Sequence, residues 1–418
     1  MFLKNDYMKK IKSNISNYLF LLIYLIGVFS FFLFIFLFEY HPFASNSSFF
    51  KPTVNYDMGI DFDYFYFAGM RAAEGKNFYF PIGDHYGHIG FIYPPLMAYV
   101  FVPFSYMPRD VSFFVYSLFS ILLLFLSVLI LSKFVKQKLI YFFITFLLFF
   151  FSPFFLLHLD RGQTNIEVVF LISLCLWFFY KQKYKLTGAL LASAVMFKLM
   201  PVLFAPYFFI KNKKIFYSTI FFGLVSVLLF GLDTISNFLV AVFNFASNVI
   251  IAGGWNTGLG GMIYNRFTYT LLSFSEAKVI LVFLGLLISA VFYYIFYRVN
   301  SKTKNVDFDI NLVLLEFGTL MFLVSFLPSV SWLHNGLYYI FIFTAYWNLR
   351  VKIPRIYDFL IQALFFLSFS QPLLLPLFDE QPFMTIFALR PGYMLLIVVL
   401  MWYFYFKITS VKNLLNNL

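Results

Sequence analysis

Carboxylates interleaved with aromatic residues mark the first segment of this sequence that could carry chemistry. The stretch MGIDFDYFYFAGMRAAEGKNFYF contains Asp61 and Asp63, and Asp57 precedes it. In a helix, Asp57 and Asp61 share a face while Asp63 points elsewhere. One or two of these carboxylates can therefore face a common centre and accept a proton there. An interfacial amphipathic segment with aromatic anchors has the same pattern, and that alternative stays open.

A second polar cluster is the stretch HLDRGQTN, residues 158–165, which joins two apolar runs. It holds Asp160, Arg161, Gln163 and Asn165 in a connection that is too short for these side chains to be merely solvated. Glu167 follows inside the next apolar run, where an acid is costly and is usually paired. We therefore expect this connection to contribute to a site.

Three further cations could bind an anion. Lys198 lies within an apolar hairpin, where it either snorkels to the interface or binds an anionic ligand. Arg266 ends the glycine-rich stretch GGWNTGLGGMIYNR, and His334 lies in SVSWLHN at the end of an apolar run. A lone histidine at a helix end is more often structural than catalytic. No metal site is expected, because Asp84, His85 and His88 lack an evident fourth ligand.

The elements that position these residues are membrane helices. Hydrophobic residues make up 62% of the 418 and charged residues 11%, against the ~25% charged of a soluble domain. Long unbroken apolar runs favour helices over a β-barrel, whose strands would alternate in polarity. The basic residues that give a net charge of +12 occur in short clusters between apolar runs. Such clusters set orientation in a membrane, so the charge does not indicate a nucleic-acid partner.

The apolar runs predict an all-α polytopic membrane protein of about twelve spanning helices in one domain, residues 1–418. The stretch 89–107 is interrupted by prolines and is expected to be re-entrant or interfacial. With the N-terminus inside, the basic clusters fall on the inner side and most acids on the outer side. Both termini are then cytoplasmic, and the outer loops are 40–110, with short interfacial helices, and 233–277. The expected spans are 17–38, 111–134, 139–158, 165–180, 186–200, 201–210, 215–232, 279–298, 311–328, 336–348, 356–374 and 391–407.

Several short motifs follow one another along the chain: Asp61-Phe62 with Tyr64 and Tyr66, then Gly75, Tyr79, Tyr93-Pro94-Pro95-Leu96, Gly162-Gln163-x-Asn165, Lys198-x-x-Pro201 and Ser331-Trp332-x-His334. In this order they resemble glycosyltransferase family 87, a family of the GT-C superfamily with many membrane spans. The resemblance covers about 60–340. Asn335 stands where the family often has a second histidine, and Asn256-Thr257-Gly258 replaces an Asn-Gln-Ser-like stretch.

The resemblance implies transfer of a hexose, with mannose favoured, from a polyprenyl-phosphate donor to a lipid or glycan acceptor. It places the protein in the bacterial cytoplasmic membrane with the active site on the extracytoplasmic face, requires no cofactor, and implies inversion at the anomeric carbon. The general base falls on Asp61. The donor phosphate would be bound by Arg161, Lys198, Arg266 and His334, and the substrates by Asp63, Tyr66, Tyr93, Gln163, Asn165, Asn256 and Trp332.

Two other classes remain open on sequence alone. A transporter or flippase of lipid-linked glycans would also have about a dozen spans, but such proteins often consist of two related halves. The acidic aromatic stretch around Asp61 occurs only once. A polymerase or ligase of envelope polysaccharides would carry a large outer loop in its second half, for which 233–277 is the candidate.

Overall fold

The computed structural model describes residues 59–79, 90–248, 256, 258–267, 274–303, 309–328, 331–374 and 380–416. Every element within these ranges is a helix, apart from one isolated antiparallel bridge between Asn256 and Trp332. The all-α prediction is therefore confirmed for this part of the chain. The expected span 17–38, Asp57, and the stretch with Asp84, His85 and His88 lie outside the described residues.

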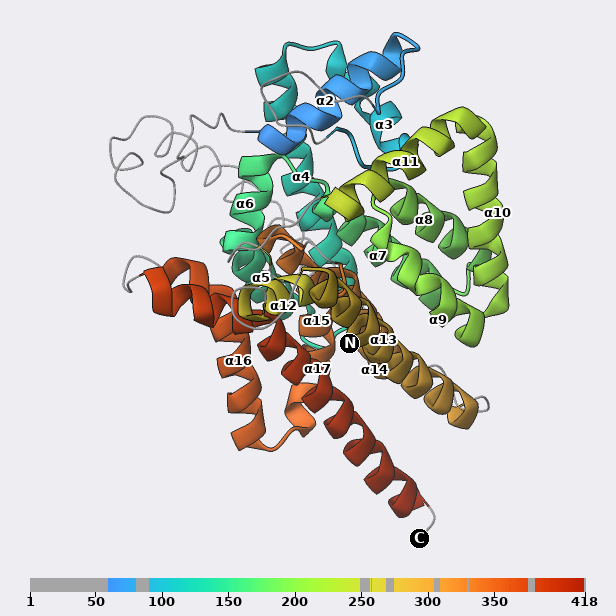
Figure 1. Ribbon diagram of the computed structural model, residues 1–418. Helices are drawn as coiled ribbons and strands as arrows, with labels where there is room; N and C mark the ends of the chain where they lie inside the picture. Colours follow the sequence, from blue (N-terminus) through green and yellow to red (C-terminus); the bar gives the residue numbers. More distant parts are fainter. Residues whose placement is uncertain are drawn as a thin grey trace, which may run out of the picture.

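The helices follow one another along the chain, as Figure 1 shows. Their bounds are α2 Ile60–Ala73, α3 Pro95–Ser105, α4 Arg109–Ser132, α5 Lys138–Phe150, α6 Pro153–Arg161, α7 Asn165–Tyr180, α8 Tyr184–Phe197, η1 Met200–Leu203, α9 Phe204–Lys211, α10 Lys213–Phe230, α11 Leu232–Asn248, α12 Leu259–Phe267, α13 Phe274–Thr303, α14 Ile310–Phe326, η2 Leu333–Tyr339, α15 Ile340–Leu349, η3 Arg350–Lys352, α16 Arg355–Leu374 and α17 Glu380–Asn416.

Among the described residues, four helices are long and apolar enough to cross a membrane: α4, α10, α13 and α17. The pair α5 and α6 makes a fifth candidate that is bent by 54°. Ser152 caps α6 through its hydroxyl, and Pro153 occupies the first helical position, so the chain cannot continue straight from α5. Within the described residues the expected spans of 165–180, 186–200, 201–210 and 311–328 form helices, but these are shorter than a full crossing.

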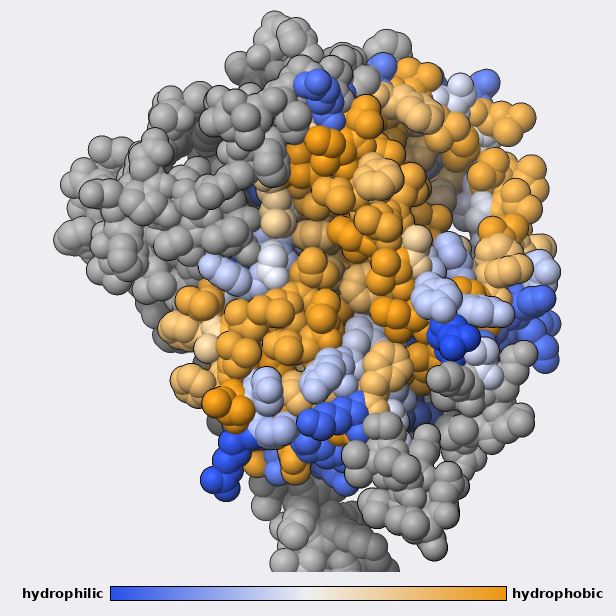
Figure 2. Space-filling view, turned by 60° about the horizontal axis from the view of Figure 1, so that its bottom comes forward, coloured by the Kyte–Doolittle hydropathy of each residue, from blue (hydrophilic) through white to orange (hydrophobic). Residues whose placement is uncertain are grey.

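Some helices lie wholly in the core, whereas others carry exposed hydrophobic side chains. In α14, all residues from Leu312 to Phe326 are buried, and α15 packs against it. By contrast, Leu228 and Leu229 of α10 are 80% and 77% exposed, although both are leucines. Figure 2 shows such hydrophobic surface over much of one face, with hydrophilic residues gathered at its margins. These surfaces are suited to contact with lipid chains.

Helices α2 and α3 form a layer at one end of the bundle, opposite the C-terminus (Figure 1). Gly69 allows their close packing, because a Cβ atom there would lie 2.6 Å from the carbonyl carbon of Phe101. Phe62 and Phe65 of α2 fill the space beneath with Phe101 and Tyr116. At 11 residues, α3 is too short to cross a bilayer core of about 30 Å. Its length fits the re-entrant or interfacial placement expected from its prolines.

Candidate active site

Two glycines with positive φ hold the start of α2 against the connection between α6 and α7. Gly59, with φ of 85°, donates its backbone N–H to the carbonyl of Asp160 at 2.8 Å. Gly162 ends α6 with φ of 67°, and a Cβ atom there would lie 2.5 Å from Cβ of Phe62. Only glycine combines this backbone conformation with this approach. The first turn of α2, which carries Asp61, therefore rests directly on Gln163.

The Gln163 side chain orients the Asp61 carboxylate. Its Nε2 donates to Asp61 Oδ2 at 2.7 Å. Its orientation is fixed from the other side, because its Oε1 accepts from the Tyr93 hydroxyl at 3.3 Å. The backbone carbonyl of Gln163 accepts from the Tyr116 hydroxyl at 2.6 Å. A carboxylate held in this way keeps its second oxygen available for a substrate proton.

Burial raises the pKa of Asp61 above its ordinary value of 3.8. The positive charges of Arg161 and Lys198 and the hydrogen bond from Gln163 act in the opposite direction, and the Asp63 charge adds to the increase. A carboxylate with increased proton affinity is a better general base than a solvated one. The arrangement around Asp61 is therefore suited to removing a proton from a hydroxyl group.

Lys198 joins the same centre from a different element. The backbone of Lys198 is extended directly after α8, which ends at Phe197, and its Nζ donates to Asn165 Oδ1. The same oxygen accepts from the Tyr338 hydroxyl at 3.3 Å. The Lys198 charge also interacts with the charges of Asp61 and Glu167. One cation and two carboxylates are thus brought together inside the protein.

A row of amides continues this network towards the second half of the chain. Asn165 Nδ2 donates to Asn335 Oδ1 at 2.8 Å, and Asn335 Nδ2 donates to Ser331 Oγ at 2.8 Å. The backbone N–H of Ser331 donates to Asn256 Oδ1 at 2.9 Å. These side chains are all buried, and Asn256 also forms the bridge with Trp332. With Asp61 and Lys198, five of the segments singled out in the sequence are therefore connected directly by hydrogen bonds.

Other buried polar groups beside Lys198 have no such partners. Neither ring nitrogen of His158 or of His334 has a hydrogen-bond partner among the described residues. The Thr164 hydroxyl has none there either. Glu167 lies beside the hydroxyls of Tyr116 and Ser120, but its oxygens make no hydrogen bond of normal geometry within the described part of the chain. Unsatisfied buried atoms are costly, so their concentration here indicates a place for a ligand.

The remaining predicted residues fall into three groups. Asp63 forms an ion pair with Arg109 at 2.8 Å, and Tyr66 donates to the carbonyl of Met107 at 2.8 Å, so both anchor α2 to its neighbours. The charge of Arg161 interacts with those of Asp61 and His334. Arg266 belongs to α12, but its side chain lies outside the described residues.

Sequence reasoning missed several members of this centre. Tyr116 and Tyr338 lie in apolar helical runs and give no signal before the fold is known. Asn335 was noticed only as a departure from the family pattern, although it bridges Asn165 and Ser331. His158 opens the polar stretch HLDRGQTN, and its position there was the available signal. Among the described residues, no three His, Cys, Asp or Glu side chains are placed to bind a metal ion.

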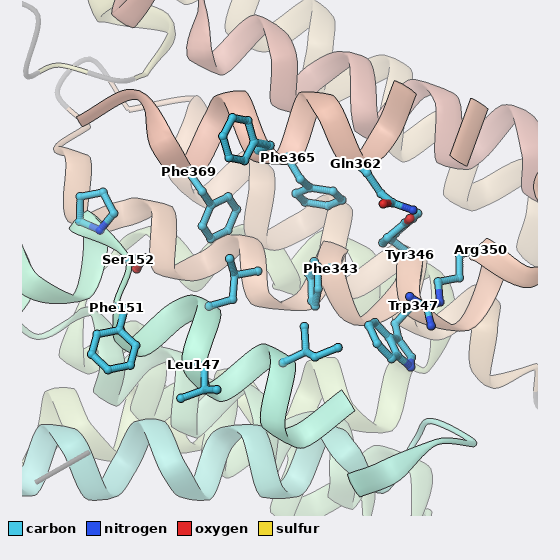
Figure 3. Close-up of a pocket in the computed structure, with 14 residues that line it drawn as sticks. Leu147, Phe151, Ser152, Phe343, Tyr346, Trp347, Arg350, Gln362, Phe365 and Phe369 are labelled. Atoms are coloured by element: carbon cyan, nitrogen blue, oxygen red, sulfur yellow. The ribbon is translucent and has the colours of Figure 1, made fainter. Parts of the chain in front are cut away.

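An apolar cavity of about 530 Å³ lies elsewhere, between α5, α15 and α16. Aromatic and aliphatic side chains form most of its wall, including Leu147, Phe343 and Phe369. Figure 3 shows two polar residues of the lining, Arg350 and Gln362, together at one end. None of the residues that line this cavity belongs to the hydrogen-bonded centre around Asp61. The cavity is therefore separate from the candidate active site.

Comparison with known families identifies the chain. The sequence profile of glycosyltransferase family 87 matches residues 91–325, which is more than half of the 418. The matched range includes Tyr93, Gln163, Asn165 and Lys198, whereas Asp61 lies before it. No curated protein matches the chain. By this match, the protein belongs to glycosyltransferase family 87 and is a glycosyltransferase.

Proposed function

We propose that this glycosyltransferase moves a hexose, with mannose favoured, from a polyprenyl-phosphate donor to a hydroxyl group of a lipid or glycan acceptor. The observation that carries the proposal is the Asp61 carboxylate, held by Gln163 at 2.7 Å within the charge field of Lys198. Such a reaction requires a base for the acceptor hydroxyl and cations for the donor phosphate. Asp61 and Lys198, which lie in one network, would supply the base and a cation.

Asp61 acts as the general base in this reaction. The acceptor oxygen forms a bond to the anomeric carbon while its proton moves to Asp61. At the same time the bond from the anomeric carbon to the phosphate oxygen breaks, and its electron pair stays on the phosphate. A phosphate is a stable leaving group, so no strong acid is needed. A single displacement of this kind inverts the anomeric carbon.

Lys198 and Arg161 bind the donor phosphate in this proposal, with His334 and Arg266 as further candidates. Lys198 is supported most strongly, because its Nζ lies in the buried centre with Asn165. Charged donors in a site that excludes water stabilise a growing negative charge more strongly than they would in solution. Tyr93, Asn256 and Trp332 are proposed to contact the sugar or the acceptor, together with the amides of Gln163 and Asn165.

We infer that the site faces the extracytoplasmic side of a bacterial cytoplasmic membrane. The support is the charge pattern: Lys133, Lys181, Lys211 and Arg350 lie at or next to helix ends and belong to basic clusters. Basic clusters remain on the cytoplasmic side. The shorter apolar helices would complete about twelve membrane passages with both termini cytoplasmic.

The reaction is tested with the purified full chain in proteoliposomes. One arm supplies a polyprenyl-phosphate hexose, and a second arm supplies the corresponding nucleotide sugar, each with membrane lipid extract as acceptor. We expect product with the lipid-linked donor alone and an inverted anomeric configuration in that product. Transfer from the nucleotide sugar without the lipid-linked donor would contradict the proposed donor class.

A further inference from the structure

The two buried histidines differ from every amide around them. Gln163, Asn165 and Asn335 each form at least two side-chain hydrogen bonds. His158 is fully buried and His334 is 2% exposed, yet none of their four ring nitrogens has a partner among the described residues. Leaving such an atom unsatisfied costs about 1–3 kcal/mol. The two histidines therefore carry the free-energy cost of unsatisfied buried atoms, whereas the three amides of the same centre are hydrogen-bonded.

These imidazoles come from two different elements that pack against each other. His158 lies in the last turns of α6, and His334 lies in η2, far away along the chain. Both imidazoles lie within electrostatic range of Lys198, and they also interact with each other. His158 is held in place on one face by Phe155, whose ring stacks with it at 5.8 Å and 12°.

On this basis, and resting on the function proposed above, we propose that His158 is a further binding residue for the phosphate of the lipid-linked donor, acting with Lys198 and His334. Each neutral imidazole can donate one N–H to a phosphate oxygen. Lys198 supplies the positive charge. The site therefore takes a phosphate ester of a long-chain alcohol, with its phosphate inside the protein.

The leaving phosphate gains negative charge during transfer, which the imidazole N–H groups can stabilise. Before transfer the phosphate is a diester with one negative charge, and afterwards it is a monoester that gains further charge. Donors aimed at the atoms where charge develops stabilise the transition state. His158 and His334 are such donors in a position where water is excluded. On this view their unsatisfied nitrogens are the cost of keeping the phosphate site ready.

The first test measures binding, so that it does not depend on sugar transfer. The full chain in detergent is titrated with a polyprenyl monophosphate and with the uncharged polyprenol of equal length. We expect His158→Leu to weaken phosphate binding about tenfold or more, the loss expected for a hydrogen bond to a charged group. Polyprenol binding should not change. His158→Gln, which keeps an N–H donor, should retain part of the affinity.

Phe142→Leu is the matched control, because it removes a buried aromatic ring that packs on Phe146, outside the centre, and no polar atom. It should leave the preference for the phosphate over the alcohol unchanged. Equal phosphate affinity in wild type and His158→Leu would overturn the proposal, as would equal losses for phosphate and alcohol. Inorganic phosphate is added as a competitor. Displacement of the lipid by millimolar inorganic phosphate would mean that the site recognises free phosphate instead.

A stability measurement supplies a second, independent reading. Replacing an unsatisfied buried polar group by an apolar one of similar size is neutral or stabilising. We therefore expect ligand-free His158→Leu to unfold at the same temperature as wild type or at a higher one. A large decrease would assign the histidine a structural role. If no sugar transfer is detected in proteoliposomes but phosphate binding depends on His158, the proposed reaction is contradicted and the proposed phosphate site is supported.

Discussion

Two centres in the described part of the chain place a lysine beside buried carboxylates, and they differ in how completely these groups are paired. Glu316 in α14 is fully buried, and its oxygens lie 3.0 and 3.1 Å from Lys211 Nζ. It also accepts from the Tyr207 hydroxyl at 2.8 Å. This closed pair leaves no capacity for a ligand. It therefore has the properties of a structural connection between α9 and α14.

The centre around Lys198 has the opposite character. Lys198 donates a hydrogen bond to Asn165, and its charge interacts with those of two carboxylates, Asp61 and Glu167. His158 and His334 have unsatisfied nitrogens within the described residues. The comparison teaches that burial of charge alone does not identify a site in a membrane protein. In the proposed site, several buried groups gathered around Lys198 are incompletely paired, which leaves capacity for a ligand.

The largest effect is expected for Asp61→Asn, which removes the base and keeps the shape. Transfer should fall by about 10²–10⁴, the usual contribution of general base catalysis. The matched control is Asp110→Asn, since the Asp110 side chain is 91% exposed at the start of α4. Initial rates in proteoliposomes measure both variants. Full activity of Asp61→Asn in a correctly folded sample would exclude its assignment as the base.

The closed pair should respond in stability instead of activity. Glu316→Ala leaves Lys211 without its partner and should destabilise the fold by about 3 kcal/mol, the low end for a broken buried pair, because Lys211 is 14% exposed. Thermal unfolding in detergent measures this loss. The double variant Glu316→Leu with Lys211→Met should recover stability. A loss of transfer in Glu316→Ala without a loss of stability would place the active site elsewhere.

Lys198→Met should weaken donor binding. Removing a charged hydrogen-bond donor from the phosphate costs about 1.5–3 kcal/mol, so the donor KM should rise about 10–100-fold. The acceptor KM is measured in parallel and should change little. A change confined to the acceptor KM would show that Lys198 does not bind the phosphate.

The smallest expected effect is a shift in the pH profile. Burial raises the pKa of Asp61 above 3.8, so the base becomes protonated and kcat/KM falls as pH decreases through that raised value. The Arg161 charge lowers this pKa, so Arg161→Gln should move the acidic limb to higher pH. A limb at or below pH 3.8, or one that does not move in Arg161→Gln, would contradict the assignment.

The sequence predicted much of this fold, because hydropathy and charge are strong signals for membrane helices. The spans around 111–134 and 215–232 became α4 and α10, with ends that differ by two residues. The run 139–158 was expected to be one span, and the bend of 54° at Ser152 and Pro153 divides it. A proline preceded by a capping serine was the local signal for this break.

The site was less predictable than the fold. Asp61, Gln163 and Asn165 were singled out by residue type in polar stretches, and the structure brings all three together. Which cations converge depends on how α6, α8 and η2 pack, and spacing along the chain does not encode that. Asp63 shows the difficulty, because it has the same residue type as Asp61 two positions away. Helix geometry turns it towards Arg109, where it forms an ion pair.

A structure of the protein with a bound polyprenyl phosphate, determined by electron cryomicroscopy, tests the central claim most directly. The account predicts phosphate density within hydrogen-bonding distance of Lys198 and His158, on the side of the centre that also holds Asp61. The closed pair of Lys211 and Glu316 should have no ligand beside it. Phosphate density at Arg350 beside the apolar cavity, with an empty centre at Lys198, would contradict the account.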